Sequence, residues 1–179
     1  MDFRKGMDMV LKLINDLDKN YPKIPKVEFL IHGENRFKDI TNLFDIKSAT
    51  NNNLKVTLLG NCTKTQIINN FHKADLFLAP SRYENYPYSL IEAMSCGLPV
   101  LAANDHAYNE IVTNENGWFY QQDDLKSMTK ALINILNLED EILLNKGFES
   151  RKYVQNKAAI DIVIPKTISF YQEILNKVD

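Results

Sequence analysis

A chain of 179 residues with 45% hydrophobic content is long enough to bury one substantial core, so we expect a single domain over residues 1–179. The net charge of −2 gives no reason to expect nucleic acid as a partner. No apolar run approaches the length of a membrane span, and the first residues lack the hydrophobic core of a secretory signal. We therefore expect a cytosolic protein without a transmembrane segment.

Residues 5 to about 20 predict the first helix. Apolar residues recur there at helical spacing, with charged residues on the opposite side. The apolar stripe consists of Met9, Val10, Leu13, Ile14 and Leu17. Lys5 and Gly6 lie at the first turn of this helix. On composition alone, a lysine in this position is most simply a solvated surface charge.

Two buried strands with a helix between them are predicted next. Residues 27–33 and 54–59 form short apolar runs bounded by proline, glycine and asparagine. The helix spans roughly residues 37–48. Gly60 and Asn61 then lie in the turn from the second strand to the next helix.

The central stretch predicts a strand, a loop, a short helix and a tight turn in succession. Residues 75–79 are an unbroken apolar run, typical of a strand covered on both faces in a parallel sheet. Pro87 suits the first helical position, because its missing amide hydrogen costs nothing there. The helix should end near Cys96, since Gly97 can take the left-handed conformation that closes a helix and Pro99 cannot continue one.

Two carboxylates belong to this central stretch, Glu84 in the loop and Glu92 on the helix. The free amides at the helix start, around Ser89, point outward with the positive end of the helix dipole and favour an anion such as phosphate. The same spacing is also typical of a capped helix that carries one buried, hydrogen-bonded glutamate. The residues alone leave both interpretations open.

The remainder of the chain predicts two more strands followed by helices. The strands lie at about residues 98–102 and 116–120, and three helices run to about 138, from 139 to 154 and from 158 to 177. Helices and strands alternate as far as residue 120, which indicates an α/β fold with a parallel sheet.

The spacing of Glu84 and Glu92, with Pro80 and Ser81 before them and residues 92–100 after, resembles the donor-binding signature of group 1 (family 4) retaining glycosyltransferases. The resemblance covers nearly the whole chain but only the C-terminal half of such an enzyme. It implies the C-terminal half of a GT-B fold, a Rossmann-like parallel sheet flanked by helices, with a helical tail at about 139–179. By this resemblance, we expect the chain to lack the first strand of that sheet and the N-terminal acceptor domain.

The resemblance also implies roles for individual residues. Glu92 accepts the ribose hydroxyls, Glu84 lies by the sugar, and Lys5 steadies the leaving diphosphate, which makes Glu84 and Lys5 the catalytic candidates. The remaining donor-binding candidates are Asn85, Tyr86, Pro87, Tyr88, Ser89, Leu90, Gly60 and Asn61. Such enzymes need no metal and no further cofactor. The family's diphosphate-binding arginine would precede Met1, so Arg4 is not its counterpart.

The favoured hypothesis is therefore a glycosyltransferase that moves a sugar from a nucleotide-sugar to a saccharide or lipid-linked acceptor with retention. The alternative is a non-catalytic nucleotide-sugar-binding module, or a fragment that needs an N-terminal-half partner chain for activity. A sugar-nucleotide epimerase fits less well, because the paired glutamates continue as Glu92-Ala93-Met94. We expect the isolated chain to be inactive alone, and peripheral at a membrane only through a partner or acceptor.

Overall fold

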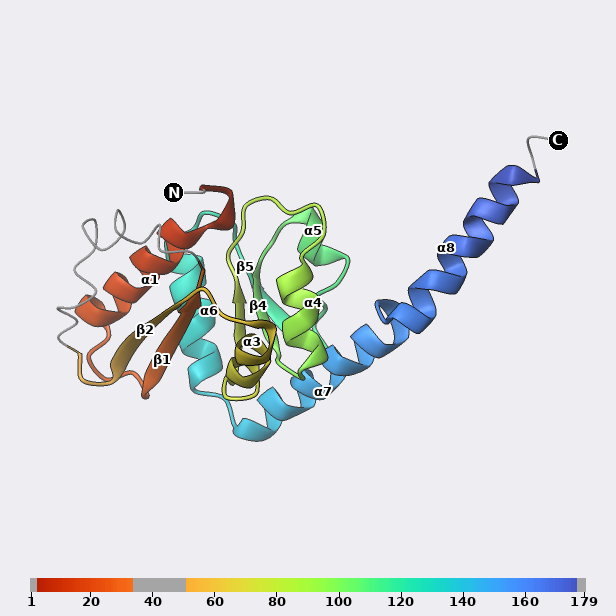
Figure 1. The fold of residues 1–179 in the computed structure, drawn as a ribbon. Coiled ribbons are helices and arrows are strands. Elements are labelled where there is room, and N and C mark those ends of the chain that lie inside the picture. The colour runs from red at the N-terminus through yellow and green to blue at the C-terminus, as the bar shows by residue number, and fades with distance from the viewer. Residues whose placement is uncertain (1–2, 34–50, 177–179) are drawn as a thin grey trace.

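A computed structural model describes residues 3–33 and 51–176 (Figure 1). The helix predicted at 37–48 lies outside these residues. The described elements run in the order η1 (Phe3–Lys5), α1 (Met7–Asn20), β1 (Val27–His32), β2 (Leu54–Gly60), α3 (Lys64–Phe71), β3 (Phe77–Ala79), α4 (Tyr88–Ser95), β4 (Val100–Ala103), α5 (His106–Asn109), β5 (Gly117–Tyr120), α6 (Leu125–Leu136), α7 (Asp140–Lys157) and α8 (Ile160–Leu175). The predicted alternation of helices and strands is confirmed.

Every strand pairing in the described residues is parallel, but the strands form two hydrogen-bonded groups. β1 pairs with β2, and β4 lies between β3 and β5. All four residues of β4 are buried, because this strand has neighbours on both edges. β1 and β3 are mostly only partly buried, and no strand among the described residues pairs with their second edges. The α/β class with parallel strands is therefore confirmed, and the described strands form two separate parallel groups.

Helix α1 packs along α6 and contributes a wide buried face. All five apolar positions predicted for it are buried, and Leu11 is buried as well. A partly buried polar contact joins the two helices, since the Thr129 hydroxyl donates to Asp16 Oδ2 over 2.8 Å. The N-terminal helix is thus fixed against the C-terminal part of the domain.

The turn after α4 is a complete glycine-ended helix cap. Gly97 has φ of 86°, its amide donates to the Met94 carbonyl at 3.0 Å, and the Leu98 amide donates to the Ala93 carbonyl at 3.2 Å. These two bonds are the pair expected where glycine takes the left-handed conformation after a helix. The predicted end of the helix is confirmed, and the cap sets the direction of the chain into β4.

Helix α8 extends away from the body of the molecule (Figure 1). None of its residues is buried, although many are apolar. The exposed large apolar residues are Ile160, Val163, Ile164, Ile168, Phe170, Tyr171, Ile174 and Leu175. Within the described part of the chain, no helix combines the length and apolarity needed to cross a membrane.

Candidate functional site

The start of α1 and the loop after β3 lie in direct contact. Gly6 has φ of 65°, a conformation that favours glycine, and a Cβ at this position would lie 1.9 Å from the carbonyl oxygen of Pro80. Two residues further along the loop, the Arg82 amide donates to the Arg4 carbonyl at 2.7 Å. The absence of a side chain at Gly6 therefore allows the two segments to meet at the carboxyl end of β3.

Both predicted catalytic residues lie at this contact. Lys5 Nζ is 2.7 Å from Glu84 Oε1, although the two residues are 79 positions apart in the sequence. The Lys5 side chain is 58% exposed and that of Glu84 is 15% exposed. The structure thus brings the two candidates together, with the lysine at the surface and the carboxylate deeper.

Helix α4 begins at Tyr88, four residues after Glu84 and one residue later than the sequence predicts. Pro87 precedes the helix and makes no side-chain capping hydrogen bond. The Tyr88 amide donates to the Tyr86 carbonyl at 3.0 Å, and the Ile91 amide donates to the Pro87 carbonyl at 3.1 Å. By helical geometry, the amides of Ser89 and Leu90 between them have no acceptor within the helix. These two amides are the ones suited to an anionic ligand.

Glu92 lies on the exposed side of α4. Its neighbours Leu90, Ala93 and Met94 are buried and hold the opposite side of the helix against the core. The alternative of a buried, satisfied glutamate is therefore wrong. The apolar neighbours in sequence misled that interpretation, because Glu92 points away from them in the helix. Of the other candidates in this stretch, Asn85 and Tyr86 are exposed and Pro87 is buried.

A buried tyrosine behind this loop was not predicted from the sequence. Tyr108 is buried and forms a hydrogen bond with Ser81, which is itself buried. Burial raises the pKa of the Tyr108 hydroxyl to about 12, so it remains neutral at physiological pH. Tyr108 belongs to the short helix α5, which follows β4.

Gly60 and Asn61 lie at the carboxyl end of β2, in the other group of strands. Gly60 has φ of 64° and its carbonyl accepts from the Gly33 amide at 3.0 Å, while Asn61 is exposed. In the described residues, no hydrogen bond or ion pair joins them to Lys5 or Glu84. The structure thus groups Lys5, Glu84 and the start of α4, and leaves Gly60 and Asn61 at a separate strand end.

A family model for glycosyl transferases group 1 matches residues 1–159. The chain belongs to this family. A relative from Escherichia coli, named UDP-Gal:alpha-D-GlcNAc-diphosphoundecaprenol alpha-1,3-galactosyltransferase, is 31% identical over 154 residues, which are 80% of this chain and 39% of that protein. The chain thus spans about two-fifths of the length of this curated relative.

Solved structures agree with this assignment at the level of the fold. Sucrose-phosphate synthase from Thermosynechococcus elongatus superposes with a TM-score of 0.77 at 19% identity, over 98% of this chain and 44% of that one. The C-terminal domain of a group 1 glycosyl transferase from Francisella tularensis gives a TM-score of 0.71 at 20% identity, over 89% of this chain and 83% of that one. The predicted likeness to the C-terminal domain of a GT-B glycosyltransferase is confirmed.

Proposed function

We propose that this chain is the donor-binding part of a glycosyltransferase that transfers a sugar from a nucleotide-sugar to a saccharide or lipid-linked acceptor with retention. The observation that carries the proposal is the contact between Lys5 Nζ and Glu84 Oε1 at 2.7 Å, in the loop that leads into α4. A cation, a carboxylate and free helix amides are thereby assembled at one end of a parallel group of strands, where open α/β folds bind ligands.

The proposed chemistry is stabilisation of the departing nucleoside diphosphate. Negative charge builds on the diphosphate as the glycosidic bond to the donor breaks, and fixed positive groups at that position lower the barrier. Lys5 is exposed enough to reach the phosphates, and the Ser89 and Leu90 amides carry the positive end of the α4 dipole. Glu84 lies by the sugar and Glu92 accepts hydrogen bonds from the ribose. These groups supply the charge without a metal ion.

The acceptor is proposed to bind across a cleft whose other wall is an N-terminal half, on the same polypeptide or on a partner chain. The superposition on a domain named as C-terminal, together with the share of the relative that this chain covers, supports this arrangement. The name of the Escherichia coli relative specifies a UDP-sugar donor and a lipid-linked acceptor. A lipid-linked acceptor would place the protein at the membrane periphery.

Calorimetric titration with nucleoside diphosphates in excess chelator tests the donor site. We expect at least one diphosphate to bind and its free nucleoside to bind more weakly, because Lys5 and the α4 amides contact phosphate. Lys5→Met should weaken the diphosphate without changing the affinity for the nucleoside. Absence of binding across the panel, or binding that requires a divalent cation, would contradict the proposal.

A further inference from the structure

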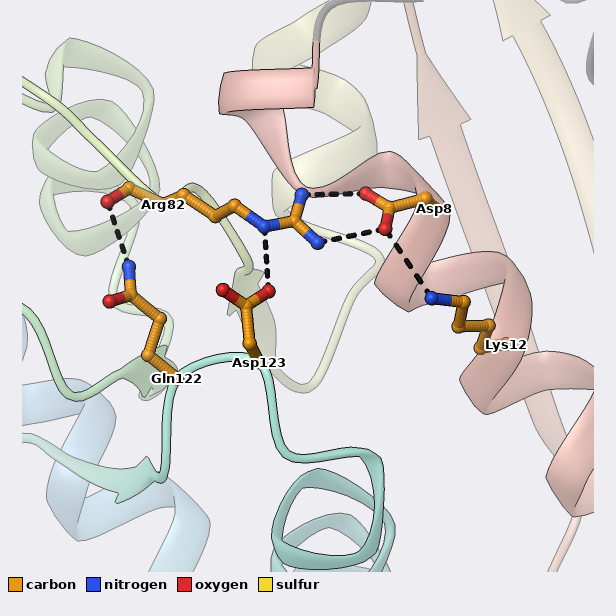
Figure 2. Close-up of polar contacts among 5 residues, drawn as sticks. All are labelled: Asp8, Lys12, Arg82, Gln122 and Asp123. Atoms are coloured by element: carbon orange, nitrogen blue, oxygen red, sulfur yellow. Dashed lines mark hydrogen bonds and ion pairs between the residues drawn. The ribbon is translucent and has the colours of Figure 1, made fainter.

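Arg82 connects three segments of the domain beside the candidate site (Figure 2). Its Nη1 and Nη2 atoms donate to the two carboxylate oxygens of Asp8 at 2.7 and 2.8 Å, and its Nε donates to Asp123 Oδ1 at 2.6 Å. Asp8 lies in the first turn of α1, and Asp123 lies in the loop before α6. We call the two-pronged contact between Arg82 and Asp8 the fork. The side chains of Arg82 and Asp8 are only 12% and 14% exposed, so the fork is shielded from solvent, whereas Asp123 is 55% exposed.

The main chain of Arg82 makes the same two connections. Its amide donates to the Arg4 carbonyl at 2.7 Å, and its carbonyl accepts from Gln122 Nε2 at 2.7 Å. Both the backbone and the guanidinium therefore reach the start of α1 on one side and the loop after β5 on the other. A planar guanidinium satisfies such a set of acceptors in fixed directions, which a single ammonium cannot do.

These contacts flank both members of the candidate catalytic pair. Arg4 precedes Lys5 by one residue, Asp8 follows it by three, and Arg82 precedes Glu84 by two. The Lys5–Glu84 pair has one largely exposed partner, and exposed ion pairs hold geometry weakly. The shielded fork is the stronger restraint on the distance between these two segments.

The positive charges of Arg82 and Lys12 keep the Asp8 carboxylate ionised. The hydrogen bonds from Arg82 lower the pKa of the Asp8 carboxyl, and Lys12 Nζ, 3.7 Å from Asp8 Oδ2, lowers it further. Each of the three guanidinium nitrogens of Arg82 donates a hydrogen bond to a carboxylate, so this side chain is engaged in the contact between the three segments.

We propose that Arg82 is a positioning residue, which clamps the start of α1 to the loop after β3 and so sets Lys5 where it meets the donor diphosphate. The effect of Arg82 on diphosphate binding rests on the proposed donor-binding function. Its joining of the two segments rests only on the contacts described above. Arg82 also ties Asp123, whose φ of 58° is unusual for a residue other than glycine, to the same site.

The test compares Arg82→Lys, which keeps the charge but loses the fork, with Lys12→Met, which removes a neighbouring cation outside the fork. UDP and GDP are titrated calorimetrically into the 179-residue chain. Arg82→Lys should weaken the better ligand about tenfold, whereas Lys12→Met should change it less than about twofold. In a Lys5→Met background, Arg82→Lys should have less than about a twofold effect, because no lysine is left to position. An equal loss in both backgrounds would overturn the proposal.

Hydrogen exchange gives a measurement that needs no ligand. Arg82→Lys should accelerate amide exchange in residues 3–8 and 82–85 while β4 keeps its protection, which also shows that the variant is folded. Unchanged exchange in both segments would overturn the clamp. If the wild-type chain binds no nucleoside diphosphate of the panel, the proposed function fails, and the exchange result still decides whether Arg82 joins the two segments.

Discussion

At the scale of single residues, a substitution of Glu92 should affect ligand binding but not folding. Its side chain is exposed on α4, so its loss should leave the core intact. Glu92→Ala should remove charge-assisted hydrogen bonds to the ribose and weaken the nucleoside diphosphate by about 1.5 to 3 kcal/mol. Calorimetry and a thermal melt measure the two properties, with Glu173→Ala on α8 as the exposed-acid control. Unchanged affinity in Glu92→Ala would contradict the assignment.

Asp8 gives the stability a defined pH dependence. The Arg82 fork lowers the pKa of Asp8 in the folded state below its ordinary value of about 3.9. The fork therefore contributes stability that is fully present above that ordinary value and is lost as the pH falls through the lowered pKa. Urea unfolding from pH 7 to pH 3 should show the free-energy difference between wild type and Asp8→Asn shrinking at the acid end. A constant difference over this range would be inconsistent with a depressed pKa.

Some candidate site residues could be named from the sequence, but not the contacts that they make. Lys5, Glu84 and Glu92 were named because residue type and spacing resemble a known signature. The contacts of Arg82 were not foreseen, because Asp8 and Asp123 lie 74 and 41 positions away and nothing local indicates that they converge. The exposure of Glu92 was also not predicted, because its apolar neighbours in sequence lie on the opposite side of the helix.

At the scale of elements, the close contact of α4 and α7 depends on two glycines. A Cβ on Gly147 would lie 2.1 Å from the carbonyl oxygen of Gly97, which is fixed in the cap that ends α4. Alanine is the better helix former by about 1 kcal/mol, but overpacking against backbone costs about 1 to 3 kcal/mol. Gly147→Ala should therefore lower the melting temperature, while Asn145→Ala on the exposed side of α7 should not. A rise in both variants would show that α7 can shift away from α4.

Element boundaries followed from local chemistry, whereas element packing did not. The start of α4, predicted at Pro87 and found one residue later, and its end before Gly97 depend on backbone preferences that act within a few residues. The small size of Gly147 matters only because Gly97, 50 positions earlier, lies against it. Likewise, the helix at 158–177 was predicted, but its sequence did not show that it extends from the body with no buried residue.

At the scale of the whole molecule, transfer requires two reactants to be held together. This chain supplies a candidate donor site, and attack by an acceptor needs both substrates fixed in one geometry. We expect the purified chain to bind donor without transferring sugar, and to gain transfer when a matching N-terminal half is supplied. The assay follows labelled sugar from a nucleotide-sugar panel to mixed acceptors, with a Lys5→Met chain as control. Robust turnover by the monomer alone would contradict this division of labour.

The two groups of strands lead to a further prediction about the effect of adding a matching N-terminal half. The amide of Val27 donates to β2 through Asn53, and the amide of Phe77 donates to β4 through Pro99. Because residues in parallel strands alternate between neighbours, the amides of Leu30 and Leu78 point to the opposite edges, where no described strand pairs with them. Unpaired strand edges also promote association.

Leu30 and Leu78 amides should therefore exchange hydrogen faster than those of Phe29 and Ala79, which lie on the paired edges of the same strands. The comparison within each strand is its own control, since global unfolding would affect all four equally. Adding a matching N-terminal half whose last strand enters between β1 and β3 should slow exchange at Leu30 and Leu78 and raise the melting temperature. Equal protection of all four amides in the chain alone would mean that both edges are already covered.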